Sequence, residues 1–532
     1  MLILLDGLDE VPTEGMSEMV TMIQNFVDRH SKNRFITSCR IAAYRNNFRR
    51  FTDVAIADFD DQQIKNFITN WFVSNPARGN ECLARLNSGD FQAAKELTQT
   101  PLLLTLVCIL YQRSGQFPTN RSTLYERALR VLLEEWNGAK EIPIEQLYKG
   151  LDTKRKELIL SQIAYDTFID DQLFFPKRTV VKQIEELLPE LLPDEKFVDG
   201  NLVLRDIEVQ HGLLVERAES IYSFSHLTIQ EFLTAQQIDY NNIPIEPLVN
   251  QYLCDKRWRE IFLLLAGLRK ADNLLLAMEQ KIHSLMNTPK LQNLLAWVEK
   301  VTDSSSGDIQ PVGKRAIAIY LAFTLDLAKI KFQPRDIYSD DIIHALACLL
   351  NTKSEDIKIK IALENQQLEM TKNQILIKAQ NLATTITERL IQHLYYFFIR
   401  IKTRTFNAIT PYISFTDYIQ WSQEFQIYQN VDYSEIIPIS EEFNKLEKPT
   451  RYNDEEIDLA FMQKLIGTWQ QGFHLNLEIL ELSESEMKAM DNYLYANLLM
   501  VECKKVAVRV SPETWKGIES RMLLPIDNTR TK

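Results

Sequence analysis

The sequence predicts a multidomain, mainly α protein: a partial α/β domain comes first, then a helical domain, a winged helix and an all-helical C-terminal region. Three observations support this fold class. A strand–helix–strand pattern fills the first 38 residues, and two short strands joined by a tight turn lie at 213–224 between helical segments. Residues 314–466 contain no glycine, which favours consecutive helices because the tight turns of sheets usually need that residue.

The first element is the aliphatic run from Met1 to Leu5. A continuous apolar run of this length is typical of a strand buried on both faces of a parallel sheet. An amphipathic helix at 16–29 and a second strand at 35–38 follow. Strand, helix and strand at this spacing form a βαβ unit, so residues 1–75 are predicted to belong to an α/β domain.

The middle of the chain changes character twice. Residues 61–137 have a helical pattern, and we assign 76–137 to a first helical domain. Residues 138–240 are predicted to form a winged helix, with strands at 213–217 and 221–224 and a helix in which Thr228 and Glu231 match a capping box. A second helical domain is expected at 241–300.

The C-terminal half is predicted to be helical throughout, with a sensor-like region at 301–450 and a compact helical domain at 451–532. Apolar residues recur every seven positions from Ile361 to Leu382, but the matching d positions are mostly polar, so we favour packed helices over a coiled coil. Ser511-Pro512-Glu513 predicts a helix start, with an N-cap serine and proline at the first helical position.

Composition narrows the classes of function. The net charge of −12 over 532 residues argues against a dedicated nucleic-acid-binding protein. The six cysteines and seven histidines are scattered without paired spacing, which predicts reduced thiols and no structural metal site. The longest strongly apolar run, 101–111, is about half of a membrane span. A cytoplasmic protein without a membrane segment is therefore expected.

The strongest chemical signal follows the first strand, in the run Leu2-Ile3-Leu4-Leu5-Asp6-Gly7-Leu8-Asp9-Glu10. A carboxylate at the end of a buried strand projects at the edge of the sheet where open α/β folds bind ligands. Asp6 is positioned to hold the Mg²⁺ of a nucleotide, and Asp9 or Glu10 to polarise the water that attacks the γ-phosphate. The alternative is that these acids belong to an ordinary solvated loop after a strand. Four apolar residues followed by aspartate are common in sequences, but the longer string, in which Asp-Gly-Leu-Asp-Glu follows the apolar residues, is far rarer.

A second signal ends the next strand, in Phe35-Ile36-Thr37-Ser38-Cys39-Arg40. An arginine at this place can approach a γ-phosphate and report its presence. Taken alone, Arg40 would be read as a surface arginine. Because the acidic motif lies about 30 residues upstream, we interpret Arg40 as a phosphate sensor.

With these two motifs the chain resembles the NACHT family, within the STAND class of signalling ATPases. Similar marks follow in order at 97–104 (Leu-Thr-Gln-Thr-Pro-Leu-Leu-Leu), 224–233 (Phe-Ser-His-Leu-Thr-Ile-Gln-Glu-Phe-Leu) and 256–260 (Lys-Arg-Trp-Arg-Glu). The resemblance implies a partial P-loop ATPase domain, in which Pro101 packs against adenine and His226 contacts the nucleotide phosphate in the ADP-bound state. In isolation, Pro101 would simply begin a helix and His226 would be a cap or core histidine. The segment 493–525 resembles a helical domain of bacterial NACHT defence proteins.

One expected motif, the phosphate-binding G-x-x-x-x-G-K-[ST], does not occur in the sequence. The nearest string, 307–315, has one residue too many between its glycines and an arginine in place of the hydroxyl. We therefore expect that the chain starts downstream of the true start or is a gene remnant. It should not hydrolyse ATP by itself, nor bind ATP, ADP or Mg²⁺ tightly.

Two functions follow from the sequence. The first is a fragment of an ADP/ATP-switched signalling ATPase that oligomerises when it senses a protein or pathogen-derived ligand, as in bacterial antiphage defence. The second is a non-enzymatic helical sensor or adaptor that carries an ATPase remnant and acts through residues 270–532. A hydrolase or transferase with its own active site is the least favoured function, because the sequence shows no Ser/His/Asp, Cys/His or metal-binding pattern beyond what chance would give.

Overall fold

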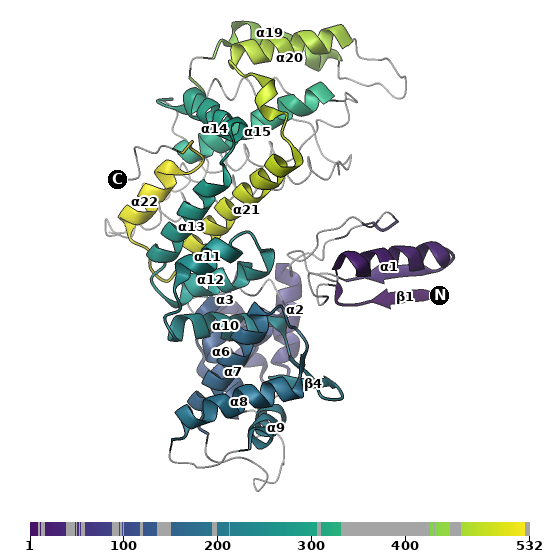
Figure 1. Ribbon diagram of the computed structural model, residues 1–532, viewed down its shortest axis with the longest axis vertical. Helices are drawn as coiled ribbons and strands as arrows, with labels where there is room; N and C mark the ends of the chain where they lie inside the picture. The colour runs from purple at the N-terminus through teal and green to yellow at the C-terminus, as the bar shows by residue number, and fades with distance from the viewer. Residues whose placement is uncertain are drawn as a thin grey trace. The chain divides into compact units, whose positions relative to one another are not determined.

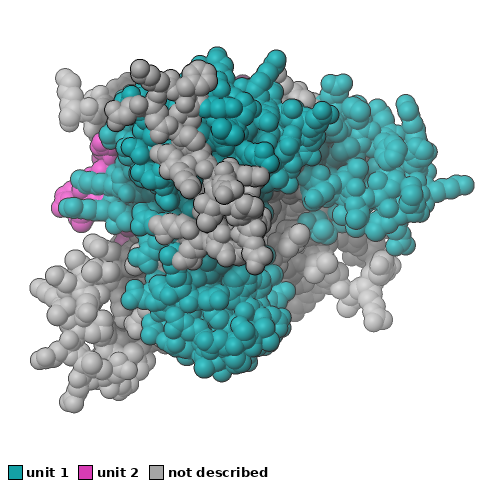
Figure 2. Space-filling view, turned by 90° about the horizontal axis from the view of Figure 1, so that it is seen from below, with its two compact units in different colours: residues 1–248, 255–271, 506–509 teal, residues 249–254, 272–505, 510–532 magenta. Residues whose placement is uncertain are grey.

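The computed structural model describes the following residues: 1–8, 11, 16–38, 48, 50–52, 54, 59–87, 95, 98, 101–117, 121–135, 151–193, 199–211, 213–305, 310–330, 423, 426–429, 431–446 and 459–526. The chain divides into two compact units (Figure 2). The first comprises Met1–Leu248, Asp255–Ala271 and Val506–Arg509, and the second comprises Val249–Cys254, Asp272–Lys505 and Val510–Lys532.

The first unit begins with the predicted βαβ unit. Strand β1 (Leu2–Leu5) pairs in parallel with β2 (Arg34–Thr37), and α1 (Met16–Arg29) connects them. Figure 1 shows α1 lying along this two-stranded sheet. The apolar side of α1 forms a small core with two loop residues; its members are Leu8, Val20, Ile23, Val27 and Phe48. The βαβ unit with its parallel strands and the helix at 16–29 are confirmed.

The expected burial of β1 on both faces is wrong. Leu2 and Leu4 remain 54% and 66% exposed, and Ile36 of β2 is 55% exposed. Side chains alternate between the two faces of a strand. Helix α1 covers the face that carries Leu5 and Phe35, which pack against the small core, and the three exposed side chains lie on the opposite face. The aliphatic run identified the strand but not which faces are covered.

Four helices follow: α2 (Asp61–Trp71), α3 (Pro76–Leu86), α5 (Pro101–Ser114) and α6 (Arg121–Glu135). This confirms the helical pattern predicted for 61–137 within the described residues. Helix α2 begins with a full capping box, in which Asp60 and Gln63 each accept from the other's backbone N–H. Helix α5 ends against α3, because Arg78 and Arg85 donate to the backbone oxygens of Tyr111 (3.1 Å) and Gly115 (3.0 Å).

The winged helix comprises α7 (Thr153–Ile169), β3 (Phe175–Pro176), α8 (Lys177–Leu191), α9 (Gly200–His211), β4 (Leu214–Ala218), β5 (Ile221–Phe224) and α10 (Leu227–Tyr240). The predicted hairpin of β4 and β5 is confirmed, and Ser220 supplies the left-handed turn residue with φ of 62°. Strand β3, which the sequence did not reveal, pairs with β5 and gives an antiparallel sheet of order β3-β5-β4.

The predicted capping box at Thr228 and Glu231 is wrong. Helix α10 begins two residues earlier than that motif requires, with His226 at the N-cap position. The backbone N–H of Ile229 donates to the His226 oxygen at 3.0 Å, so Thr228 already lies within the first turn. Its hydroxyl is buried and has no hydrogen-bond partner within the described part of the chain. The residue types match a capping box, but Thr228 lies inside the helix and not at its N-cap position.

After α11 (Ile245–Tyr252), the first unit continues with the short helix η5 (Lys256–Trp258) and with α12 (Arg259–Leu268). Trp258 is fully buried and meets Phe168 of α7 edge to face. Helix α12 also approaches α6 closely. A Cβ on Gly267 would lie 2.2 Å from the Ser122 hydroxyl oxygen, so only glycine fits there without rearrangement.

The second unit is helical wherever it is described, as the fold class predicts. It contains α13 (Asp272–Leu285), α14 (Pro289–Thr302), α15 (Pro311–Ile330), α19 (Tyr433–Leu446), α20 (Leu459–Gly472), η7 (Leu477–Leu480), α21 (Glu484–Val506) and α22 (Pro512–Arg521). Helix α22 starts with Ser511-Pro512-Glu513, as predicted. The heptad-like segment at 361–382 lies outside the described residues.

Helix α22 is held on α13 at both of its ends (Figure 1). Asp272 accepts from the Thr514 hydroxyl at 2.7 Å at the start of α22. Glu279 accepts from the Arg521 guanidinium at 2.8 and 2.9 Å at its last residue. No described helix of the chain is long and apolar enough to cross a membrane.

Candidate functional site

The end of β1 and the end of β2 meet at one edge of the small sheet. Because Leu5 lies opposite Thr37, the next residues, Asp6 and Ser38, are neighbours. The Ser38 hydroxyl donates a hydrogen bond to Asp6 Oδ1. It also accepts from the backbone N–H of Gly7 at 2.9 Å. The predicted cation ligand therefore lies at the carboxyl edge of a parallel sheet, beside a hydroxyl that the sequence analysis did not single out.

The loop that carries Asp6 is shaped by Gly7. Gly7 has φ of 76°, a left-handed conformation that costs glycine little. Its N–H therefore faces Ser38, and the chain returns so that the Leu8 N–H donates to the Ser38 backbone oxygen at 3.0 Å. Asp6 itself is exposed, as is Ser38. The carboxylate is held in place and remains open to solvent.

Three of the predicted site residues, Asp9, Glu10 and Arg40, lie outside the described residues. Their roles in polarising water and sensing phosphate stay predictions. The described part of this edge thus contains Asp6 and Ser38.

Pro101 and His226 each stand at the start of a helix. Pro101 is the first residue of α5 and is exposed. His226 is the N-cap residue of α10, also exposed, and its side chain makes no capping hydrogen bond. These positions exclude a core role for His226 and fit the simpler role of Pro101 as a helix start. They do not test the nucleotide contacts implied for either residue.

The residues at the edge fit a magnesium ion bound through a nucleotide. In the described ranges, no group of three or more His, Cys, Asp and Glu side chains could hold a metal ion. Mg²⁺ in nucleotide sites usually takes one or two carboxylates, with phosphate oxygens and waters as its remaining ligands. An exposed Asp6 with one oxygen already held by Ser38 can serve as that carboxylate, directly or through a water.

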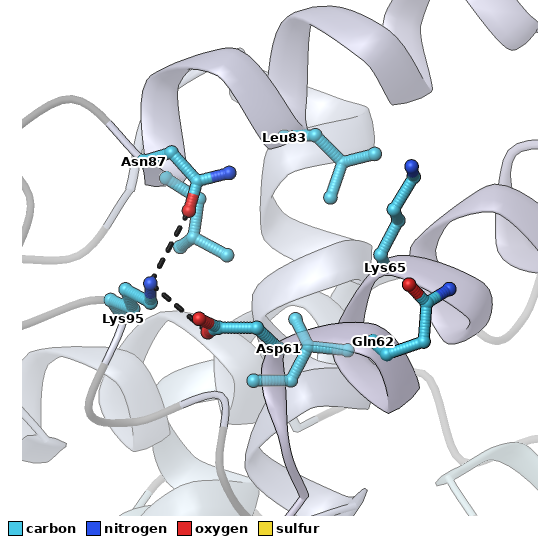
Figure 3. Close-up of a pocket in the computed structure, with 8 residues that line it drawn as sticks. Asp61, Gln62, Lys65, Leu83, Asn87 and Lys95 are labelled. Atoms are coloured by element: carbon cyan, nitrogen blue, oxygen red, sulfur yellow. Dashed lines mark hydrogen bonds and ion pairs between the residues drawn. The ribbon is translucent and has the colours of Figure 1, made fainter.

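A pocket of about 450 Å³ lies between the start of α2, the end of α3 and Lys95 (Figure 3). Ile64 and Leu86 form its buried apolar floor. The Lys95 amine pairs with the carboxylate of Asp61 at 3.0 Å and lies 3.4 Å from Asn87 Oδ1. These groups satisfy one another rather than converging on a ligand. The pocket could not be predicted from a sequence pattern, because its lining residues come from three separate segments.

The described cysteines behave as packing residues. Cys82 and Cys108 are fully buried. Burial raises the pKa of the Cys82 thiol to about 12 and also raises that of Cys108. At neutral pH both thiols stay protonated, and a protonated thiol is a poor nucleophile or metal ligand. Nucleophilic cysteine chemistry is not favoured at these two positions.

Comparison with known proteins agrees with the order of these domains. Residues 121–238 match a family described as the winged helix-turn-helix domain C-terminal to NACHT, and residues 439–525 match the NACHT C-terminal helical domain 2. The first match begins inside the predicted first helical domain, and the boundary predicted at 138 lies outside the described residues.

A relative from Xenopus tropicalis, NLR family CARD domain-containing protein 4, is 23% identical over 239 residues. The matched region covers 44% of this chain and 21% of that protein. The chain thus spans about a fifth of the length of this relative. Taken together, the two matches show that the chain carries two domains typical of NACHT proteins, in their expected order, and the similarity to this relative agrees with that assignment.

Proposed function

We propose that the chain works in a signalling protein whose state is switched by ADP and ATP. The observation that carries the proposal is the position of Asp6, at the carboxyl edge of a parallel sheet and upstream of two NACHT-associated domains. That edge is where open α/β folds bind nucleotides. A carboxylate there, open to solvent and already oriented, suits a ligand for nucleotide-bound Mg²⁺.

In this proposal the other predicted residues complete the site. Asp9 or Glu10 orients the attacking water, and Arg40 senses the γ-phosphate. Pro101 packs against adenine, and His226 contacts the phosphate in the ADP-bound state. Exchange of ADP for ATP then permits self-oligomerisation, which passes the signal to an effector. The printed sequence contains no phosphate-binding loop, so hydrolysis by residues 1–532 alone is not expected.

The biological setting belongs to the same proposal. A protein or pathogen-derived ligand would be sensed in the cytoplasm by the helices of the second unit. Bacterial antiphage defence is the setting that the segment 493–525 suggested. The matched relative carries NLR and CARD in its name, which supports signalling in general but does not distinguish this setting from others.

The charges of α9 and of the β4–β5 hairpin do not favour nucleic acid as the partner of this part of the winged helix. Helix α9 carries one arginine, Arg205, against the acids Asp206 and Glu208. Arg217 in β4 donates to the Ser223 hydroxyl at 2.9 Å and is therefore engaged within the hairpin. A winged helix that binds DNA presents several cations to the phosphates. We infer that this winged helix acts within the protein rather than on DNA.

The proposal is tested by thermal unfolding with ADP and Mg²⁺. Two proteins are compared: residues 1–532, and the same residues preceded by the sequence encoded immediately upstream of Met1. Ligand at about 100 times its Kd stabilises the folded state by about 2.7 kcal/mol. We expect this response from the extended protein only. The Asp6→Asn variant of the extended protein should lose most of it.

One result would contradict the proposal, and another would contradict only the expectation that residues 1–532 bind nucleotide weakly. An extended protein that contains G-x-x-x-x-G-K-[ST] but fails to respond would favour the alternative, a non-enzymatic helical sensor or adaptor. A response by residues 1–532 alone would show that the phosphate-binding loop is dispensable, and the expectation of weak binding by this chain would be wrong.

A further inference from the structure

We propose that Ser38 is a positioning residue for Asp6: its hydroxyl holds one carboxylate oxygen and so directs the other toward a divalent cation. This inference rests on the proposed function, since it deepens the role of Asp6 as a cation ligand. It assigns a task to a side chain at the end of β2 that touches no nucleotide in the proposed scheme.

The hydrogen bonds of the Ser38 hydroxyl leave it a single orientation. A serine hydroxyl has one proton to donate. Here the oxygen accepts from the Gly7 N–H at 2.9 Å, and the proton is donated to Asp6 Oδ1. Because the Gly7 N–H occupies one side of the oxygen, the proton is turned toward the carboxylate. The hydroxyl is therefore a fixed donor at this edge and not a freely rotating one.

The backbone of Ser38 is held independently of its side chain. The Ser38 N–H donates to the Leu5 oxygen at 2.9 Å, and the Ser38 oxygen accepts from the Leu8 N–H at 3.0 Å. The first bond continues the parallel ladder by one step, and the second ties the loop after β1 to the end of β2. Removal of the hydroxyl should therefore leave the strand ends in register and free only the Asp6 side chain and the Gly7 N–H.

The geometry leaves the second oxygen of Asp6 available. Asp6 Oδ1 is taken by Ser38, and within the described residues Oδ2 accepts no hydrogen bond. Both side chains are exposed, so water competes for each contact. A carboxylate that already has one oxygen fixed loses less rotational freedom when it binds a cation. Ser38 thus contributes to cation affinity without contacting the cation.

The test uses the 532-residue chain with free Mn²⁺ ions as the probe. Mn²⁺ broadens NMR signals of nearby nuclei, so the Gly7 amide signal reports its arrival at Asp6 even when binding is weak. Four variants are compared with the unchanged chain: Ser38→Ala, Ser38→Thr, Asp6→Asn, and the control Ser31→Ala, which removes an exposed hydroxyl from the turn before β2.

We expect Ser38→Ala to weaken Mn²⁺ binding about fivefold, the factor that corresponds to the net contribution of a typical hydrogen bond in water. Ser38→Thr keeps a hydroxyl and should restore the affinity, and Ser31→Ala should not change it. Asp6→Asn should abolish the broadening.

Hydrogen exchange of the Gly7 amide provides a second measurement that needs no metal. Ser38→Ala removes its acceptor and should accelerate exchange, whereas the Ser38 amide, bonded to Leu5, should keep its protection.

Three outcomes would overturn parts of this account. If Ser38→Ala binds Mn²⁺ like the unchanged chain while Asp6→Asn does not bind it, Ser38 is not a positioning residue and Asp6 stays a cation ligand. If broadening near Gly7 is absent or unaffected by Asp6→Asn, the cation role of Asp6 fails, and with it that of Ser38. If Gly7 exchange is unchanged in Ser38→Ala, the hydrogen bond at the origin of the inference does not form.

Discussion

The carboxyl edge of β1 and β2 and the interior of the winged helix each contain a carboxylate held by a neighbouring side chain, but the two differ in exposure. Asp6 at the edge is exposed and accepts from the Ser38 hydroxyl. Asp206 of α9 is buried, with its side chain 1% exposed, and its carboxylate lies 2.7 Å from the amine of Lys156 on α7. Lys156 is itself only 9% exposed.

This difference separates a carboxylate that can bind a ligand from one that holds helices together. Burial raises the pKa of Asp206, and the neighbouring Lys156 lowers it by a smaller amount, so the pKa stays above its ordinary value. A buried pair of this kind can be displaced only at a high cost in free energy. Asp6, in contrast, can bind an ion without losing a protein contact, since its second oxygen accepts no hydrogen bond from the described residues. Exposure and an open oxygen, rather than residue type, mark the candidate site.

The largest effect is expected from Lys156→Met. The substitution keeps an apolar stem but leaves Asp206 as a buried carboxylate without the ammonium. Removing one partner of a buried pair costs about 3–5 kcal/mol, and we expect a loss near the lower figure, about 3 kcal/mol, at neutral pH. Urea unfolding of the unchanged and variant chains measures it. A loss below about 1 kcal/mol would mean that the pair of Lys156 and Asp206 is screened by solvent, as an exposed pair would be.

The pH dependence of that loss has a definite sign. A carboxyl group whose pKa is raised on folding binds its proton more tightly in the folded state, so stability falls as pH rises from the ordinary aspartate pKa through the raised one. Replacing Lys156 removes the influence that lowers this pKa and extends the window to higher pH. The deficit of Lys156→Met should therefore shrink as the pH is lowered from about 7 to about 5. A deficit independent of pH would contradict a charged Asp206 as its cause.

A smaller effect is expected from Glu279→Gln in the second unit. Glu279 is 9% exposed in its side chain but its partner Arg521 is 39% exposed, so solvent screens the pair and part of the amide's hydrogen bonding survives. We expect a loss of about 1–2 kcal/mol. Glu513→Gln in the exposed first turn of α22 is the matched control and should cost about 0.3 kcal/mol. Equal losses would show that the pair of Glu279 and Arg521 does not hold the last turn of α22 on α13.

The smallest effect is expected from Thr228→Val. A capping box would lose about 1 kcal/mol when the threonine hydroxyl is removed. The structure instead leaves this hydroxyl buried and without a partner among the described residues, so the apolar valine should change stability by less than about 0.5 kcal/mol, in either direction. Thermal unfolding at a single pH suffices. A clear destabilisation would restore the capping-box interpretation and place the start of α10 later.

Much of the fold could be predicted because local signals sufficed for it. The α1 helix at Met16–Arg29 follows an apolar period, and the β4–β5 hairpin follows two short strands around a turn. Strand β3 was missed because two residues, one of them a proline, carry no period and depend on β5 for their pairing. The covered faces of β1 were misjudged because an aliphatic run does not reveal which elements pack against it.

The candidate site was predictable in part. Asp6 could be placed because a carboxylate directly after a strand of a parallel sheet lies at the carboxyl edge of that sheet. Ser38 stood in the quoted motif, but its hydrogen bonds require the register of β1 and β2 and the left-handed Gly7. No residue spacing encodes such a contact between two strand ends. A hydroxyl following the second strand was the available signal, and it was too common to be singled out.

The central claim, that Asp6 belongs to a nucleotide site, is tested most directly by titration calorimetry. ADP with Mg²⁺ is titrated into the chain extended upstream of Met1, with and without Asp6→Asn. We predict that the substitution weakens binding about tenfold or more in the presence of Mg²⁺, and much less when EDTA removes the metal, because Asp6 acts through the cation. Equal affinities for both proteins in Mg²⁺ would contradict the claim.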